Sequence, residues 1–148
     1  MRALTVRDLL PFSQTEPTVV SERTPLREVA QKMVEDPRTR EVYVVDEEGR
    51  FVGVITLRRL AHWAFARRLP RDLSPTELLD LVSAETAGDL ALRKPAYVRL
   101  DDPLETLLRV MFRYDVNEIP VVSPEGQIVG NLNMLEILAA WLRGRMGE

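Results

Sequence analysis

The side chains that most often carry catalysis are scarce in this sequence of 148 residues. It contains no cysteine, which excludes a thiolate nucleophile, a disulfide framework and a cysteine zinc site. His62 is the single histidine, so a metal site or a histidine acid–base centre has little support. No spacing of acidic residues singles out a catalytic pair, and neither a glycine-rich phosphate loop nor a Gly-x-Ser-x-Gly motif is present. The sequence therefore predicts a protein that is not an enzyme.

Composition narrows the remaining classes. Hydrophobic residues make up 45% of the chain and charged residues 29%, which is ordinary for a globular protein. The formal net charge of −3 disfavours non-specific binding to nucleic acid. No apolar run approaches the roughly 20 residues of a membrane helix, and no signal-peptide pattern opens the chain. We expect a cytoplasmic protein with no membrane or nucleic-acid partner.

The strongest pattern is an internal repeat. The segment Asp46–Thr56 recurs as Ser123–Asn133, and each copy follows an apolar run, residues 42–45 and 119–122. Each segment has a glycine at the end of its loop, which suits the positive φ of a hairpin turn. A duplication of this length predicts two similar halves, with a groove between them as a natural binding site.

Helix-start signals set the elements around each hairpin. Thr24-Pro25 and Asp102-Pro103 each predict an N-cap with proline at the first helical position. Short helices are expected earlier, where Thr5 and Thr86 each precede an aspartate by three residues. Each half is thus predicted as β-α-β-β-α after a short helix, in an α/β fold of the α+β type. We place the first repeat at residues 1–69, a connector with a short helix at 70–85 and the second repeat at 86–148.

Two such halves need one another. Each has roughly 60 residues, a size at which a single core is marginally stable. Packing the two sheets together as a pseudo-twofold pair would create two symmetry-related clefts. Trp141 fits the inward stripe of the last helix, whereas Trp63 suits a dimer contact and a core position equally well.

These motifs resemble the CBS-domain pair, or Bateman module, from about Thr5 to Leu142. The closest match is Gly53-Val54-Ile55-Thr56, and Gly130-Asn131-Leu132-Asn133 followed by Glu136 is a looser one. The resemblance implies two tandem repeats that bind an adenosine-containing ligand, namely AMP, ADP, ATP or S-adenosylmethionine, in the clefts between them. No catalytic cofactor is implied.

The second repeat supplies most of the site that the resemblance implies. Glu136 would accept hydrogen bonds from both ribose hydroxyls, and Asn133 stands where the family has a hydroxyl. First-strand contacts to adenine would come from Tyr97 and Val98, and an apolar wall from Ile119 and Pro120. The alternative is that Glu136 is a first-turn acid that interacts with the helix dipole.

The first repeat departs from this pattern. It keeps Thr56 at the hydroxyl position, and Val19 and Val42 stand in its first two strands. Arg59, however, replaces the acid, and a guanidinium cannot accept ribose hydroxyls. Arg58 and Arg59 could meet phosphates at the helix N-terminus, or they are two solvated arginines.

Phosphate binding meets a second obstacle. Glu41 and Glu118 occupy places where nucleotide-binding members often carry a basic residue, and a carboxylate beside a phosphate disfavours binding. This weakens the case for ATP and leaves adenosine, S-adenosylmethionine or AMP, with phosphates held by other arginines; the candidates are Arg38, Arg40 and Arg113. Alternatively, the two glutamates pair with neighbouring arginines on the surface.

The resemblance predicts a stand-alone regulatory module that senses an adenosine-type ligand. The family tends to form flat dimers through its helices, so a homodimer is expected, with output through an unidentified effector protein. The alternative is an interaction or scaffolding module that dimerises and has vestigial clefts. Arg59, Glu41 and Glu118 favour that alternative.

Overall fold

The computed structural model describes residues 3–93 and 95–146, which belong to two compact units. The first-repeat unit comprises Thr18–Pro95, and the second-repeat unit combines the chain up to Pro17 with the chain from Ala96 onward. The compact units differ from the expected division into consecutive ranges, which were 1–69, 70–85 and 86–148. Each segment that precedes a repeat packs on the other repeat, because its apolar residues are buried in that repeat's core.

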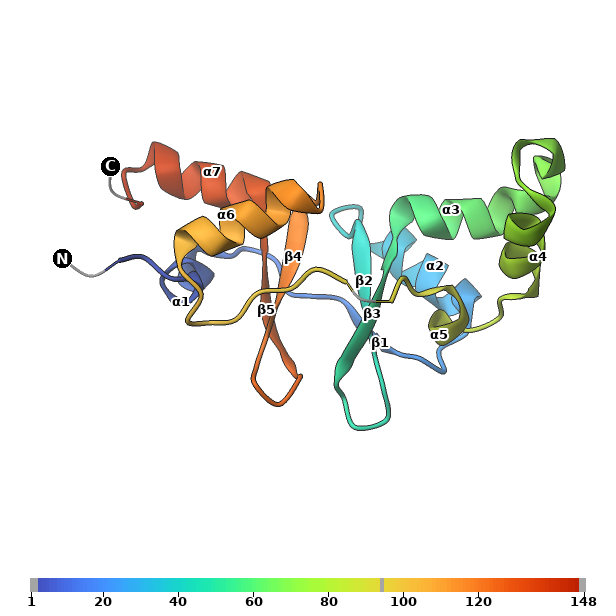
Figure 1. Cartoon of the computed structure of the whole chain (residues 1–148), viewed down its shortest axis with the longest axis horizontal. Coiled ribbons are helices and arrows are strands. Elements are labelled where there is room, and N and C mark those ends of the chain that lie inside the picture. The colour runs from blue at the N-terminus through green and yellow to red at the C-terminus, as the bar shows by residue number, and fades with distance from the viewer. Residues whose placement is uncertain (1–2, 94, 147–148) are drawn as a thin grey trace. The chain divides into compact units, whose positions relative to one another are not determined.

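The first-repeat unit contains a three-stranded sheet and four helices (Figure 1). The sheet order is β1-β2-β3, with β1 and β2 parallel and β2 and β3 antiparallel. Figure 1 shows α4 beside the C-terminal end of α3. In chain order the elements are β1 (Val19–Ser21), α2 (Leu26–Glu35), β2 (Glu41–Val45), β3 (Phe51–Thr56), α3 (Leu57–Phe65), η2 (Ala66–Arg68), η3 (Pro70–Asp72), α4 (Pro75–Ser83) and α5 (Ala87–Leu90).

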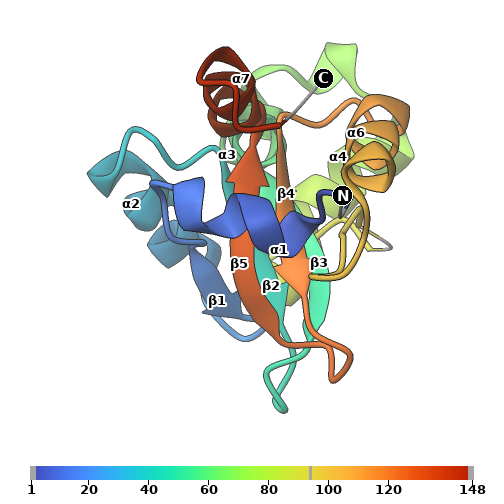
Figure 2. The ribbon, with the colours of Figure 1, turned by 90° about the vertical axis from the view of Figure 1, so that its left-hand side faces the viewer.

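The second-repeat unit contains a two-stranded antiparallel sheet and three helices. Figure 2 shows the N-terminal helix α1 crossing the β4–β5 hairpin. The elements are α1 (Val6–Leu9), η1 (Leu10–Phe12), α6 (Leu104–Arg113), β4 (Glu118–Val122), β5 (Ile128–Asn133) and α7 (Met134–Leu142). The predicted α+β fold class is confirmed.

The predicted first strand of the second repeat is wrong. It is reduced to an isolated parallel bridge between Val98 and Val121. In the first-repeat unit, the Tyr43 backbone N–H donates to the Thr18 carbonyl (N···O 2.8 Å) and extends the pairing of β1 with β2. Pro120 occupies the corresponding place in β4 and has no N–H to donate. The third strand therefore cannot extend beyond the bridge.

The two hairpins confirm the repeat in detail. Gly49 and Gly126 take positive φ values of 78° and 89° at the loop ends, as predicted for these turns. Both hairpins also contain a register irregularity at corresponding places, between Val44 and Val45 and between Val121 and Val122. The duplicated sequence therefore gives the same bulged hairpin twice.

The predicted caps of the longer helices are one residue early. The N-cap residues are Pro25 and Pro103, and neither helix has a side-chain cap hydrogen bond. Asp102 instead accepts from the Arg99 backbone N–H (N···O 2.8 Å). The short helices behave as predicted, because Thr5 and Thr86 each form a capping box with the aspartate three residues later.

The position predicted for Trp141 is also wrong. Its exposed fraction is 55%, while Ile137 and Ala140 are buried in the core of the second-repeat unit. Helix α7 is apolar on nearly every side, so the apolar spacing did not determine which face turns inward. None of the described helices has the length and apolar character needed to cross a membrane.

Candidate functional site

The closing helices α3 and α7 begin with the same type of cap. Thr56 Oγ1 accepts from the Arg59 backbone N–H (3.1 Å), and Asn133 Oδ1 accepts from the Glu136 backbone N–H (2.8 Å). In α7 the Glu136 carboxylate also returns a bond, because its Oε1 accepts from the Asn133 backbone N–H (3.0 Å). This reciprocal capping box places a carboxylate at the positive end of α7.

The other oxygen of Glu136 binds a segment that is distant in sequence. Glu136 Oε2 accepts from the Gln14 backbone N–H (2.6 Å). The same segment is attached to β5 where Ser13 Oγ donates to the Asn131 carbonyl (3.1 Å). We call residues 13–15 the N-terminal strap. The sequence analysis missed Gln14, because its contact uses a backbone N–H that almost every residue type has.

Arg59 makes the corresponding contact in the first-repeat unit. Its Nε donates to the Leu90 carbonyl (2.8 Å), in a segment, residues 90–92, that we call the connector strap. Leu92 exchanges two backbone hydrogen bonds with Val54 on β3, at 3.2 and 2.8 Å. Arg59 is thus half-buried and bonded, while its neighbour Arg58 is exposed. Arg59 and Glu136 occupy corresponding positions in the two repeats. The cationic side chain donates to a backbone carbonyl, and the anionic side chain accepts from a backbone N–H.

The other predicted residues of the second repeat divide into buried and exposed members. Val98 and Ile119 are buried in the core, and Pro120 is buried on β4 beside Val98, whose N–H donates to the Pro120 carbonyl (3.1 Å). Tyr97 is 44% exposed. The Arg99 guanidinium carbon lies 5.1 Å from the centroid of the Tyr97 ring, a cation–π contact that leaves aromatic surface beside a positive charge.

In the first repeat, Val19 and Val42 also differ. Val42 is fully buried in the core of its unit, whereas Val19 on the edge strand β1 is 41% exposed. Their positions identify Val42 as a packing residue. Val19, Thr56 and Arg59 are the predicted members of this repeat that retain some exposed surface.

Glu118, one of the two glutamates that disfavour phosphate, contacts a buried polar side chain. Asn131 Nδ2 donates to Glu118 Oε1 (2.8 Å), and Asn131 is only 2% exposed. The corresponding residue of the first repeat is Val54, so this buried polar contact belongs to the second repeat alone. Asn131 was not among the predicted residues, although a polar residue at an otherwise apolar strand position is a visible signal.

Two arginines considered for phosphate are already engaged at the surface. Arg38 Nε lies 3.2 Å from Asp36 Oδ1, and hydrogen bonding from the Arg38 side chain lowers the pKa of Asp36. Arg40 donates to the Pro37 carbonyl. Arg113 lies exposed at the end of α6. The hydrogen bonds of Glu136 are instead made with Asn133 and Gln14, so its carboxylate is the better defined feature.

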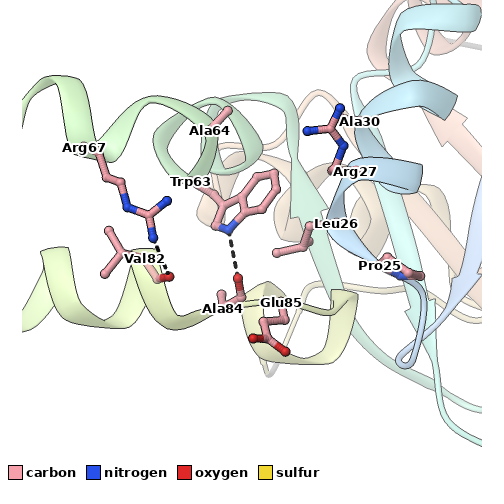
Figure 3. Close-up of a pocket in the computed structure, with 10 residues that line it drawn as sticks. All are labelled: Pro25, Leu26, Arg27, Ala30, Trp63, Ala64, Arg67, Val82, Ala84 and Glu85. Carbon is pink, nitrogen blue, oxygen red and sulfur yellow. Dashed lines mark hydrogen bonds between the residues drawn. The ribbon is translucent and has the colours of Figure 1, made fainter.

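A groove of about 720 Å³ lies among α2, α3 and α4 (Figure 3). The Trp63 indole N–H donates to the Ala84 carbonyl (3.0 Å), and the Arg67 guanidinium donates to the Val82 carbonyl (3.5 Å). Trp63 packs against the core of its unit, so the core alternative describes it. None of the predicted ligand residues lines this groove, which is formed by Pro25, Leu26, Arg27, Ala30, Trp63, Ala64, Arg67, Val82, Ala84 and Glu85.

Metal chemistry finds no centre in the part of the chain that the structure describes. Across residues 3–93 and 95–146, no group of three or more histidine, cysteine or acidic side chains is placed to hold an ion. His62 is exposed on α3.

Comparison with known proteins gives a family match in both halves of the chain. The model of the CBS domain matches residues 5–65 and 87–143. Among curated proteins, the magnesium transporter MgtE of Thermus thermophilus is 33% identical over 97 residues, which are 66% of this chain and 18% of the transporter. The chain thus spans less than a fifth of that relative.

Solved structures agree with this match. A CBS domain-containing protein of Thermotoga maritima superposes with a TM-score of 0.80 and 35% identity, over 98% of this chain and 99% of that one. The cytosolic domain of the Mg²⁺ channel MgtE in complex with ATP gives a TM-score of 0.63 and 27% identity, over 90% of this chain and 51% of that one.

Proposed function

Because the chain belongs to the CBS-domain family, we propose that it is a regulatory module that binds an adenosine-containing ligand through its second repeat. The observation that carries this proposal is the fixed carboxylate of Glu136. Each of its oxygens accepts one backbone N–H, from Asn133 and from Gln14. A carboxylate offers about four acceptor sites, so each oxygen keeps capacity for one ribose hydroxyl.

The charged groups of the second repeat indicate which ligands would suit the site. Two vicinal hydroxyls bound to one carboxylate form a bidentate, charge-assisted contact. Tyr97 and Arg99 form a cation–π pair toward the hairpin end of β4, where the Arg99 guanidinium donates to the Ser123 carbonyl, and this flat, positively charged pair suits contact with an adenine face. Glu118 disfavours a long polyphosphate, and this supports AMP, adenosine or S-adenosylmethionine over ATP. The ATP complex of the MgtE cytosolic domain supports an adenine ligand in general.

We further propose that the module acts as a homodimer and signals through an effector protein. Helix α7 presents Leu135, Leu138, Trp141 and Leu142 outward, with exposed fractions from 47% to 78%. This face carries no charged side chain, so a second copy of the same apolar face is its best match. Ligand binding would act on an effector only if the ligand prefers one arrangement of the module.

A specific observation favours the scaffolding alternative. Both Arg59 and Glu136 bind straps of the chain itself, which gives each a structural role without any ligand. In that case the clefts would be vestigial and the dimer would be the functional unit. Ligand binding separates the two functions.

The direct test is a thermal shift assay with AMP, ATP, adenosine and S-adenosylmethionine. A ligand at one hundred times its Kd should stabilise the protein by about 2.7 kcal/mol. We expect AMP or adenosine to raise Tm more than ATP does. If none of the four changes Tm, the sensor proposal fails for these ligands and the scaffolding function remains.

The dimer is tested by light scattering at micromolar concentration. Wild-type protein should have the mass of two chains. Leu135→Glu should give monomers, because it places a charge in the apolar face while an acid in the first turn still suits the helix dipole. Val129→Glu is the matched control, since Val129 is an exposed apolar residue on β5 of the same unit. A monomeric wild-type mass contradicts the proposal.

A further inference from the structure

The N-terminal strap lies against the residue proposed to bind the ligand. Gln14 donates its backbone N–H to Glu136 Oε2 at 2.6 Å, and its own side chain is exposed. A short bond between an amide and an ionised carboxylate is among the stronger hydrogen bonds of proteins. The contact therefore fixes the outer oxygen of Glu136, while the capping box fixes the inner one.

We propose that the Gln14 backbone N–H is a positioning group for Glu136, so that the N-terminal strap forms part of the ligand site of the second repeat. The inference rests on the proposed function of Glu136 as the acceptor of ribose hydroxyls. With both oxygens held, the carboxylate presents its two remaining acceptor positions in a fixed direction, and little side-chain freedom is lost when a diol binds. Without the strap contact, the capping-box bond to Oε1 would be the one described bond that orients the Glu136 carboxylate.

The strap itself is fixed at a neighbouring point. Ser13 Oγ lies 3.1 Å from both the Asn131 carbonyl oxygen of β5 and the Thr15 carbonyl oxygen, so its one proton is shared between these two acceptors. Asn131 in turn donates to Glu118. The strap thus joins the strand that carries Asn131 to helix α7, whose first turn carries Glu136. The Glu136 carboxylate and residues 13–15 therefore hold one another in place.

The first repeat shows that this role is specific to the second. Arg59 donates to the Leu90 carbonyl, so the connector strap meets a cation through an acceptor. A diol cannot be accepted there by the guanidinium. The N-terminal strap alone brings a donor to an acidic residue, which leaves that residue able to accept from a ligand.

Proline provides a substitution that removes the donor and also fixes φ of residue 14 at about −65°. Ser13 has φ −68° and ψ 133°, the backbone region that a residue before proline prefers. Gln14→Pro deletes the N–H, whereas Gln14→Ala deletes the exposed side chain and keeps the N–H. The pair separates the backbone contact from every effect of losing glutamine.

The experiment measures AMP affinity of the full chain by titration calorimetry. We expect Gln14→Pro to weaken AMP binding about tenfold or more, and Gln14→Ala to stay within about twofold of wild type. Wild-type affinity in the folded Gln14→Pro variant would overturn the inference. An equal loss in both variants would overturn it too, because the side chain and not the N–H would then be responsible.

A ligand-free measurement distinguishes this inference from the proposed function. Amide hydrogen exchange at Gln14 should accelerate about tenfold in Glu136→Gln and remain unchanged in Glu105→Gln, a control at an exposed acid on α6. If wild type does not bind AMP while Gln14 shows this acceleration, the proposed function fails for AMP, and the positioning of Glu136 by the Gln14 N–H is still supported. If the rate of amide exchange at Gln14 is the same in wild type and Glu136→Gln, the positioning contact itself is overturned.

Discussion

The two repeats share a frame and differ in one charged contact. In both, a polar residue caps the closing helix, and the side chain three residues later binds the backbone of a segment at or after a short helix. In the first repeat that side chain is Arg59 on a carbonyl; in the second it is Glu136 on an N–H. The comparison teaches that a duplicated position can keep its structural task while its sign of charge changes. Only the acidic version can also accept hydroxyl groups.

The sheets differ in a related way. Tyr43 donates a backbone hydrogen bond that extends the three-stranded sheet, and Pro120 in the second repeat cannot. The second repeat is therefore the less regular of the two, and it contains the buried polar contact between Asn131 and Glu118. The departure from the regular frame therefore lies in the same repeat as the proposed ligand site.

The largest expected difference in stability concerns the glycines inside strands β3 and β5. A Cβ on Gly53 would lie 2.8 Å from Ala91 Cβ and 3.0 Å from the Leu92 carbonyl oxygen, while a Cβ on Gly130 would meet the flexible end of Leu10 at 3.0 Å. We expect Gly53→Ala to lower the free energy of unfolding by about 3 kcal/mol and Gly130→Ala by about 1 kcal/mol. Urea denaturation measures both, and equal losses would contradict the difference between a backbone neighbour at Gly53 and a flexible side-chain neighbour at Gly130.

The strap contacts themselves give the next effect. Glu136→Ala removes two bonds to backbone N–H groups and should cost about 2 kcal/mol, whereas Arg59→Ala removes one bond and should cost about 1 kcal/mol. Arg58→Ala is the control, since Arg58 is exposed beside Arg59 and should change stability by less than about 0.5 kcal/mol. A loss in Arg58→Ala as large as in Arg59→Ala would remove the distinction between bonded and solvated arginines.

A smaller effect is expected from placing an acid in the first repeat. Arg59→Glu should not create a second ligand site, because the Leu90 carbonyl would face a carboxylate and repel it. The variant should be less stable than Arg59→Gln by about 1 kcal/mol and bind as much AMP as wild type. Additional AMP bound per chain would show that the sign of charge alone determines which repeat is functional.

The smallest effect concerns α5, the short helix that leads into the connector strap. Backbone N–H groups of Glu85 and Thr86 donate to Asp89 and lower the pKa of its carboxyl. A lowered folded-state pKa stabilises the protein above the unfolded value of about 3.9, and this stabilisation disappears as the pH falls through the folded-state pKa. Asp89→Asn should therefore reduce the loss of stability between about pH 5 and pH 2 in acid titrations followed by circular dichroism. An unchanged acid profile would contradict this assignment.

The sequence predicted the parts of the fold that depend on local signals. The hairpin glycines Gly49 and Gly126 and the capping boxes at Thr5 and Thr86 are where the pattern placed them. The inward face of α7 was wrong at Trp141, because an almost entirely apolar helix offers no polar face to orient it. The missing strand near Val98 depended on one absent N–H at Pro120.

The candidate site was predictable only in its side chains. Glu136 and Asn133 were assigned through the family resemblance, but their partner Gln14 was not, since a backbone N–H leaves no mark in the sequence. The exchange of segments between units was also missed. It depends on Val6, Leu9, Ala87 and Leu90 being buried in the core of the other repeat, and short apolar helices do not specify which core they join. The roles of the predicted ligand residues remain predictions.

The central claim is that the second repeat alone carries the ligand chemistry, through Glu136. Titration calorimetry with AMP tests it most directly, with wild type, Glu136→Ala and Arg59→Ala compared at the same concentration. We predict a single AMP per chain for wild type and for Arg59→Ala, and no measurable binding for folded Glu136→Ala. Two AMP molecules per chain, or wild-type affinity in Glu136→Ala, would contradict it.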